Sequence, residues 1–393
     1  MVFAYVLIVI VIGSVLFHFV SPWSATPLAS NWQSMDDTLT ITLVVTGLFF
    51  VVINFFVAYT LFRYRHRDGG RASYEPENSR LERWLIGITT VGIALLLAPG
   101  LFVYAQYINA PREAITLEVL GQQWQWYYRF PGADGKLGPT DARFVSAANP
   151  FGLDARDPAG QDDFLVAGTE VHLPLNKPVR VLLRSHDVLH DFFVPPFRAR
   201  MNIVPGQMST FWFTPTVRGR YEAMCAQLCG IGHPNMRGYV VVEDEAAFQA
   251  WLKTQPTFAM TMASASRPAA ATSATGADSL VAQGQALAQS RGCAACHTVD
   301  GSARVGPTWK GLYGTTRALA DGSTVLADED YLRRSILEPQ AQVVKGFPPI
   351  MPPANLGNDE VAALLAYMRS LGGAASAPPA PVPVPAPGQK AQR

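Results

Sequence analysis

The residues best suited to redox chemistry lie in one short stretch, Cys225 to Met236, together with a histidine well upstream at His190. The stretch holds two thiols, an imidazole and a thioether, which are soft ligands that suit copper far better than calcium or magnesium. Zinc is the competing metal, but structural zinc sites are built from cysteine and histidine without methionine. The methionine therefore favours copper. The other interpretation is that Cys225 and Cys229 form a disulfide.

A second motif, Cys293-Ala-Ala-Cys296-His297, has the C-x-x-C-H spacing that attaches a c-type haem. The two thiols would form thioether bonds, and His297 would be the proximal iron ligand. A thioredoxin-like redox pair is the alternative, but a proline follows at Pro307, where small class I cytochromes place the carbonyl that accepts the imidazole N–H. Met351, in a proline-rich loop, is the expected sixth ligand, and His/Met ligation raises the reduction potential into the range useful for electron transfer.

The copper-type stretch resembles the binuclear copper A loop of cytochrome c oxidase subunit II, which has the pattern C-x-[EQ]-x-C-x3-H-x2-M. The spacing from His190 to Cys225 is also that of the family. The resemblance implies two coppers bridged by the thiolates of Cys225 and Cys229. It further implies that His190 and His233 each bind one copper, with Met236 and the backbone carbonyl of Gln227 as weak axial ligands.

Three apolar runs occupy the first part of the chain, at residues 2–20, 39–62 and 84–107. A bilayer core needs roughly 20 such residues in a helix, so the second and third runs are predicted spans. The first is either a third span or a signal peptide, and its length and lack of a basic start favour the span. Six arginines separate the last two runs, whereas residues 21–38 contain no Lys or Arg. This predicts a bacterial inner-membrane protein whose metal and haem motifs are periplasmic.

Beyond residue 113 the pattern becomes alternating, as in Ile115, Leu117 and Val119, which indicates short β-strands. The predicted fold class is multidomain: N-terminal transmembrane α-helices, an all-β Greek-key domain and an all-α cytochrome c domain. The resemblance identifies the β domain as a cupredoxin. Residues 131–168 are interpreted as a surface insertion. The predicted segments are 1–20 (transmembrane helix or signal sequence), 21–112 (two-helix hairpin), 113–256 (copper A domain), 257–280 (linker), 281–372 (cytochrome c domain) and 373–393 (disordered tail).

The order of these segments is similar to caa-type cytochrome c oxidase subunit II. The resemblance implies that electrons pass from cytochrome c to haem c, to copper A and then to oxidase subunit I, where dioxygen is reduced to water with proton translocation. Subunit III is a further expected partner. Trp124 matches the tryptophan over the copper site where electrons enter, and Glu82 stands near the family's proton-entrance carboxylate. A helix-start carboxylate is the alternative for Glu82.

The sequence leaves several questions about metal binding and the reaction undecided. Gln227 stands where many relatives carry a glutamate that also binds magnesium, which puts that magnesium site in doubt. A nitric oxide reductase could use the same copper A subunit, so the gas consumed is undecided. A copper delivery protein is disfavoured because storage needs no covalent haem. The net charge of +1, without a basic stripe, argues against a nucleic-acid partner.

Overall fold

The computed structural model describes residues 2–22, 26–71, 76–146, 149–166, 168–266, 276–302, 304–351 and 356–372. The chain divides into two compact units, residues 1–265 and 266–393. The predicted tail at 373–393 and the middle of the predicted linker lie outside the described residues.

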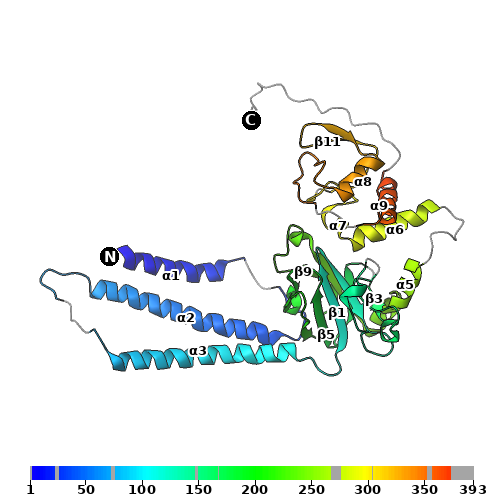
Figure 1. Ribbon diagram of the computed structural model, residues 1–393. Helices are drawn as coiled ribbons and strands as arrows, with labels where there is room; N and C mark the ends of the chain where they lie inside the picture. Colours follow the sequence, from blue (N-terminus) through cyan, green and yellow to red (C-terminus); the bar gives the residue numbers. More distant parts are fainter. Residues whose placement is uncertain are drawn as a thin grey trace, which may run out of the picture. The chain divides into compact units, whose positions relative to one another are not determined.

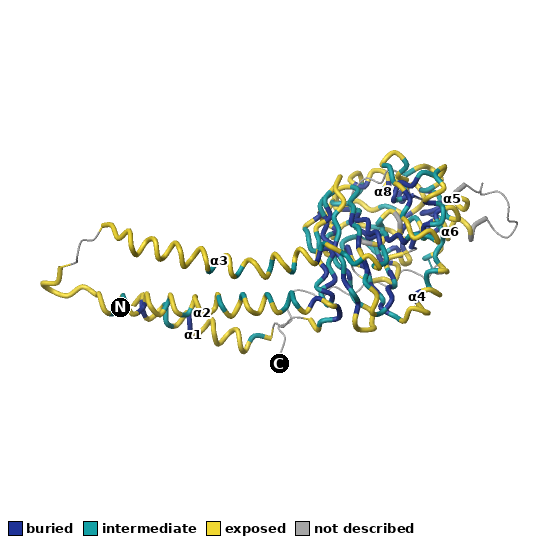
Figure 2. The backbone as a smooth tube through the Cα atoms, turned by 90° about the horizontal axis from the view of Figure 1, so that it is seen from below, coloured by how far each residue is buried: buried dark blue, intermediate teal, exposed yellow. Residues whose placement is uncertain are grey.

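Three long helices begin the first unit: α1 (Val2–Val20), α2 (Gln33–Arg63) and α3 (Ser79–Ile108). Each is long and apolar enough to cross a membrane, and each contains one of the three predicted apolar runs. Most of their residues are exposed, as the colouring of the backbone in Figure 2 shows. Such a surface is stable only where lipid or other apolar helices cover it.

Two five-stranded sheets follow and form a sandwich (Figure 1). The first sheet has the order β3-β2-β1-β5-β8 and the second β4-β10-β9-β6-β7. The first is built from β1 (Ile115–Gln122), β2 (Gln125–Phe130), β3 (Phe164–Leu165), β5 (Val179–Ser185) and β8 (Ser209–Phe213). The second is built from β4 (Glu170–Pro174), β6 (His190–Val194), β7 (Ala199–Ile203), β9 (Gly219–Cys225) and β10 (Arg237–Glu243). Their facing side chains make one core, which includes Leu117, Val181, Phe192, Phe211 and Val240.

The alternation predicted for β1 fails at Glu118. This residue lies between the apolar Leu117 and Val119, yet it is buried, and the neighbouring Leu120 is buried as well. The reason is the segment 131–168, which is more than a surface insertion because it folds back over this face. Its residues Phe151 and Leu153 pack with Leu120 in a second, smaller core.

Charged side chains under the insertion are paired. Arg129 is buried between Glu118 and Asp163, and its Nη1 lies 2.7 Å from Oδ2 of Asp163. Arg184 contacts the other oxygen of Glu118, with Nε 2.5 Å from Oε1. Buried charges are tolerated only when paired in this way. The pairing ties the insertion to β1, β2 and β5.

After β10 come α4 (Glu245–Leu252) and α5 (Phe258–Ser266). Helix α5 begins inside the predicted linker, and Phe258 is fully buried against the insertion. The described start of the linker is therefore part of the first unit, because its one large aromatic group has an apolar surface to cover.

The second unit is mainly helical. Its elements are α6 (Gly276–Ser290), α7 (Cys293–Cys296), β11 (Thr316–Ala318), β12 (Thr324–Leu326), α8 (Glu329–Leu337) and α9 (Asn358–Ser370). Helices α6 and α9 cross closely at Gly284, where a Cβ atom would lie 2.0 Å from the carbonyl oxygen of Ala363. The core around them includes Trp309, Leu332 and Leu364.

Candidate functional site

The predicted copper ligands meet at one end of the second sheet. His190 is the first residue of β6 and Cys225 is the last residue of β9, and these two strands are antiparallel neighbours. The loop from β9 to β10 then carries Cys229, His233 and Met236. Strand pairing therefore brings together ligands that are far apart in the sequence, while the rest come from one loop on a rigid support.

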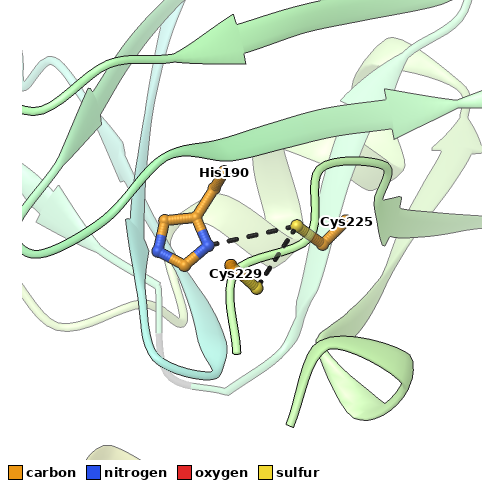
Figure 3. Close-up of side chains that lie close together, drawn as sticks. All are labelled: His190, Cys225 and Cys229. Atoms are coloured by element: carbon orange, nitrogen blue, oxygen red, sulfur yellow. Dashed lines mark hydrogen bonds between the residues drawn. The ribbon is translucent and has the colours of Figure 1, made fainter. Parts of the chain in front are cut away.

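The ligand atoms converge in a buried cluster, shown in Figure 3. The sulfurs of Cys225 and Cys229 are 3.7 Å apart, and Nδ1 of His190 lies 4.0 Å from the sulfur of Cys225. On the other side, Nδ1 of His233 is 3.6 Å and the sulfur of Met236 is 4.0 Å from the sulfur of Cys229. Both cysteines are free thiols. A disulfide requires about 2.05 Å between sulfurs, so the structure holds the two cysteines close together as free thiols.

A carboxylate orients the first histidine. Nε2 of His190 lies 2.8 Å from Oδ1 of Asp187, and because a carboxylate can only accept, Nε2 carries the proton. The unprotonated Nδ1 then faces Cys225. Burial lowers the pKa of His190, but the hydrogen bond with Asp187 and the contact with Cys225 outweigh it and raise that pKa overall.

The two thiols affect each other's protonation. A hydrogen bond from Cys229 lowers the pKa of Cys225 to about 3, against the opposing effect of burial. A thiolate is the form of cysteine that binds metal. The backbone carbonyl of Gln227, which the resemblance gives as a further ligand, lies 3.2 Å from the sulfur of Cys225.

Trp124 lies against the loop that carries these ligands. Its Nε1 donates to the carbonyl of Cys229 at 3.2 Å, and the Gln123 side chain donates to the same carbonyl at 2.8 Å. A Cβ atom at Gly232 would lie 2.2 Å from the indole ring. A glycine at this position therefore lets the indole ring pack directly against the loop.

The predicted haem motif has its proximal histidine in place. His297 donates from Nδ1 to the carbonyl of Pro307 at 2.7 Å, which leaves Nε2 for an iron. Its ring stacks on Trp309, with centroids 5.3 Å apart. A Cβ atom at Gly306 would lie 2.6 Å from Cε1 of His297. Burial lowers the pKa of His297, which keeps the imidazole neutral and able to bind metal.

The remaining predicted residues have the following places in the structure. Cys293 and Cys296 bound the single turn of α7 and are free thiols. The carbonyl of Met351 accepts a hydrogen bond from the Gln340 side chain at 3.2 Å. Pro352 and Pro353 of the same loop lie outside the described residues. Glu82 is in the first turn of α3 and exposed.

Sequence reasoning missed the residues that support the ligands, namely Asp187, Gln123 and Gly232. For Asp187 a signal was available. It stands three residues before His190, and a carboxylate that close to a metal-binding histidine is a common partner for its second ring nitrogen.

Two family models match the chain. Residues 115–244 match the periplasmic domain of cytochrome c oxidase subunit II, and residues 281–372 match cytochrome c. With the three apolar helices, the sandwich and the helical second unit, these matches confirm the predicted fold class. The donor set of His190, Cys225 and Cys229 fits the copper A centre that the first match implies, and the His297 pocket fits the haem of the second.

Three relatives show how far the likeness extends. An alternative cytochrome c oxidase subunit 2 from Bradyrhizobium diazoefficiens is 51% identical over 256 residues, which are 65% of this chain and 92% of the relative. Cytochrome c oxidase subunit 2 of Cereibacter sphaeroides is 28% identical over 251 residues, 58% of this chain and 78% of the relative. That of Alkalihalophilus pseudofirmus is 23% identical over 354 residues, 88% of this chain and 89% of the relative.

Proposed function

Because the chain belongs to the subunit II family of cytochrome c oxidases, we propose that it is the subunit through which electrons enter a haem–copper oxidase. Electrons would come from a cytochrome c, reach the haem held at Cys293 and Cys296, pass to copper A and leave for the catalytic subunit. The observation that carries this proposal is the buried convergence of His190, Cys225 and Cys229, next to the sulfur and nitrogen donors of the following loop.

In this proposal the chain's own residues hold the metals and keep water away. Cys225, Cys229, His190 and His233 would hold the two coppers, with Met236 and the Gln227 carbonyl as weaker ligands. When bound, the two coppers supply a one-electron carrier. The strands fix the ligands, and the burial of His190 and Met236 excludes solvent, so little rearrangement accompanies a change of charge.

Cys293 and Cys296 would hold the haem covalently, and His297 and Met351 would bind its iron. The contact of His297 with Pro307 orients the ring, and the close approach of Gly306 keeps space for it. One haem would be bound per chain.

The three long apolar helices support a location in the membrane and contacts with other oxidase subunits. We propose that α1 is retained as a third span, because it packs along α2 through buried Ala4, Val11 and Ala58. The copper and haem units then lie on the periplasmic side of a bacterial inner membrane. Oxidase subunit I, and with it subunit III, would cover part of the exposed helices. Glu82 is proposed to stand at the cytoplasmic entrance of a proton path.

Dioxygen is the proposed gas because the relatives reported above are all named as cytochrome c oxidase subunits. The nitric oxide alternative finds no support among them. Membranes that contain the complex, reduced by ascorbate and a mediator, should consume dioxygen in a cyanide-sensitive manner and acidify the outside. Rapid loss of nitric oxide with negligible dioxygen uptake would contradict the assignment.

The copper assignment has its own test. The copper-loaded chain should show an EPR signal from one electron shared by two equivalent copper nuclei, and Cys229→Ser should abolish it while leaving the haem spectrum unchanged. A four-line mononuclear copper signal in the unaltered chain would show that the ligand assignment is wrong.

A further inference from the structure

The chain passes from the membrane helices to the sandwich after α3, and the segment before α2 also contacts the sandwich, with the amide of Ala29 donating to the carbonyl of Pro196 at 2.7 Å. After α3, only residues 109–114 separate the helix from β1. A connection this short and irregular would by itself allow the sandwich to swing, since relative motion is the default for linked parts without a tight contact. The contacts at Tyr107, the last residue but one of α3, oppose such motion.

The Tyr107 hydroxyl forms two hydrogen bonds with the backbone of one residue. It accepts from the amide of Arg200 at 2.9 Å and donates to the carbonyl of Arg200 at 3.1 Å. Arg200 lies in β7, which is the edge strand of its sheet. The hydroxyl therefore takes the place that a neighbouring strand would occupy.

Aromatic contacts hold the Tyr107 ring. The ring is buried, stacks on Phe211 with centroids 5.2 Å apart, and meets Trp32 edge-on at 5.3 Å. The Trp32 indole donates to the carbonyl of Trp212 at 2.8 Å, and the Trp212 indole donates to the carbonyl of Gln106 at 2.7 Å. Hydrogen bonds therefore join the residue before α2 to strand β8, and strand β8 to the end of α3.

From Arg200 a short series of contacts leads to the metal ligands. Its Nε lies 3.1 Å from Oδ2 of the buried Asp191, the residue that follows His190. The carbonyl of Asp191 accepts from the amide of Ala226 at 3.0 Å, and Ala226 follows Cys225. The end of α3 is therefore connected to the strand ends that carry both ligands.

We propose that Tyr107 is a positioning residue that fixes the height and orientation of the copper loop above the membrane. It touches none of the ligands, so it acts only through the strands. Electron transfer to a partner in the membrane slows steeply with distance, and small misplacements of reacting groups carry large rate costs. The inference rests on the proposed function, because it concerns the step from copper to the catalytic subunit.

The test is Tyr107→Phe in the complete oxidase complex, with Tyr104→Phe as the matched control. Tyr104 lies one turn earlier on α3 and is exposed. The phenylalanine keeps the ring packing and removes only the two hydrogen bonds. Time-resolved optical spectroscopy should show electron transfer from haem c to copper at the normal rate, an unchanged copper EPR signal, and transfer from copper to the catalytic subunit slowed roughly tenfold.

A second contact between the membrane helices and the sandwich provides an independent variant. Asp36, in the first turn of α2, pairs with Arg198 through Nε at 2.7 Å and Nη2 at 2.8 Å. Asp36→Asn should therefore slow the same step, and it decides the question if Tyr107→Phe does not assemble. Equal rates in variant and wild type would overturn the inference, and so would loss of copper or slowing of both steps, which indicate a general structural role. A wild-type complex whose copper passes no electrons would instead refute the proposed function.

Discussion

The carboxylate of Asp187 and the imidazole of His190 are joined by a hydrogen bond of 2.8 Å, and this contact determines which ring nitrogen faces Cys225. Asp187 is itself held by the backbone amides of Gln123 and Val188, each at 2.7 Å. The orientation of the His190 ring is therefore set by hydrogen bonds within the protein itself.

Asp187→Asn should lower copper affinity roughly 10- to 100-fold, because an amide is a weaker partner for the ring N–H than a carboxylate. Copper titration of the purified chain measures this. Asp134→Asn is the control, since Asp134 is exposed and accepts a hydrogen bond from the nearby amide of Lys136. Equal affinities in the two variants would contradict the role of Asp187.

Gly306→Ala should disturb the haem unit. The added Cβ would lie 2.6 Å from the His297 ring, so the ring must move away from the Pro307 carbonyl. We expect a loss of about 1–3 kcal/mol in the free energy of unfolding of this unit, together with a partly high-spin haem spectrum. In the control, Gly357→Ala, the nearest atom is 3.8 Å from the added Cβ and the spectrum should be unchanged.

Trp124→Phe should slow electron transfer from haem c to copper by roughly tenfold, because the hydrogen bond to the Cys229 carbonyl is lost and the ring no longer keeps its position on the loop. Stopped-flow reduction of copper measures this step. Gly232→Ala should have the same effect by displacing the ring. Normal rates in both variants, as in the control Trp251→Phe, would exclude Trp124 from the path of electrons.

Asp163 makes stability depend on pH. Burial raises its pKa to about 6, although Arg129 and the Gly138 amide lower it. From about pH 4 to pH 6 the folded chain then binds more protons than the unfolded chain, so the free energy of unfolding falls as pH rises, by about 1–3 kcal/mol. Calorimetry should show this fall in the wild type and a smaller one in Asp163→Asn. Parallel profiles would mean that Asp163 titrates normally.

Much of the fold follows from local patterns in the sequence. The apolar runs predict the three helices, and the soft ligands at fixed spacing predict which side chains converge. Glu118 shows where such reasoning ends. Its place between apolar neighbours predicts an exposed position, but an insertion tens of residues away buries it and Arg129 pairs with it. Local alternation carries no information about such a long-range contact.

The candidate site also contains residues that the sequence predicts and residues that it does not. Ligands can be predicted because their chemistry is rare in the sequence, whereas their supports are ordinary residues. Gln123 and Gly232 are common types at unremarkable positions, and their roles arise only when the loop folds against Trp124. Tyr107 belongs to the same class, since its partner Arg200 is distant in the sequence and bonds through its backbone.

The contact between Tyr107 and strand β7 also bears on solubility during assembly. An edge strand offers unpaired amides and carbonyls to any neighbouring chain, which is a common start of aggregation. Copies of a membrane protein are confined to a plane, so newly made chains meet often before their partner subunits arrive. By occupying the amide and carbonyl of Arg200, the chain's own helix hinders a second copy from adding a strand there.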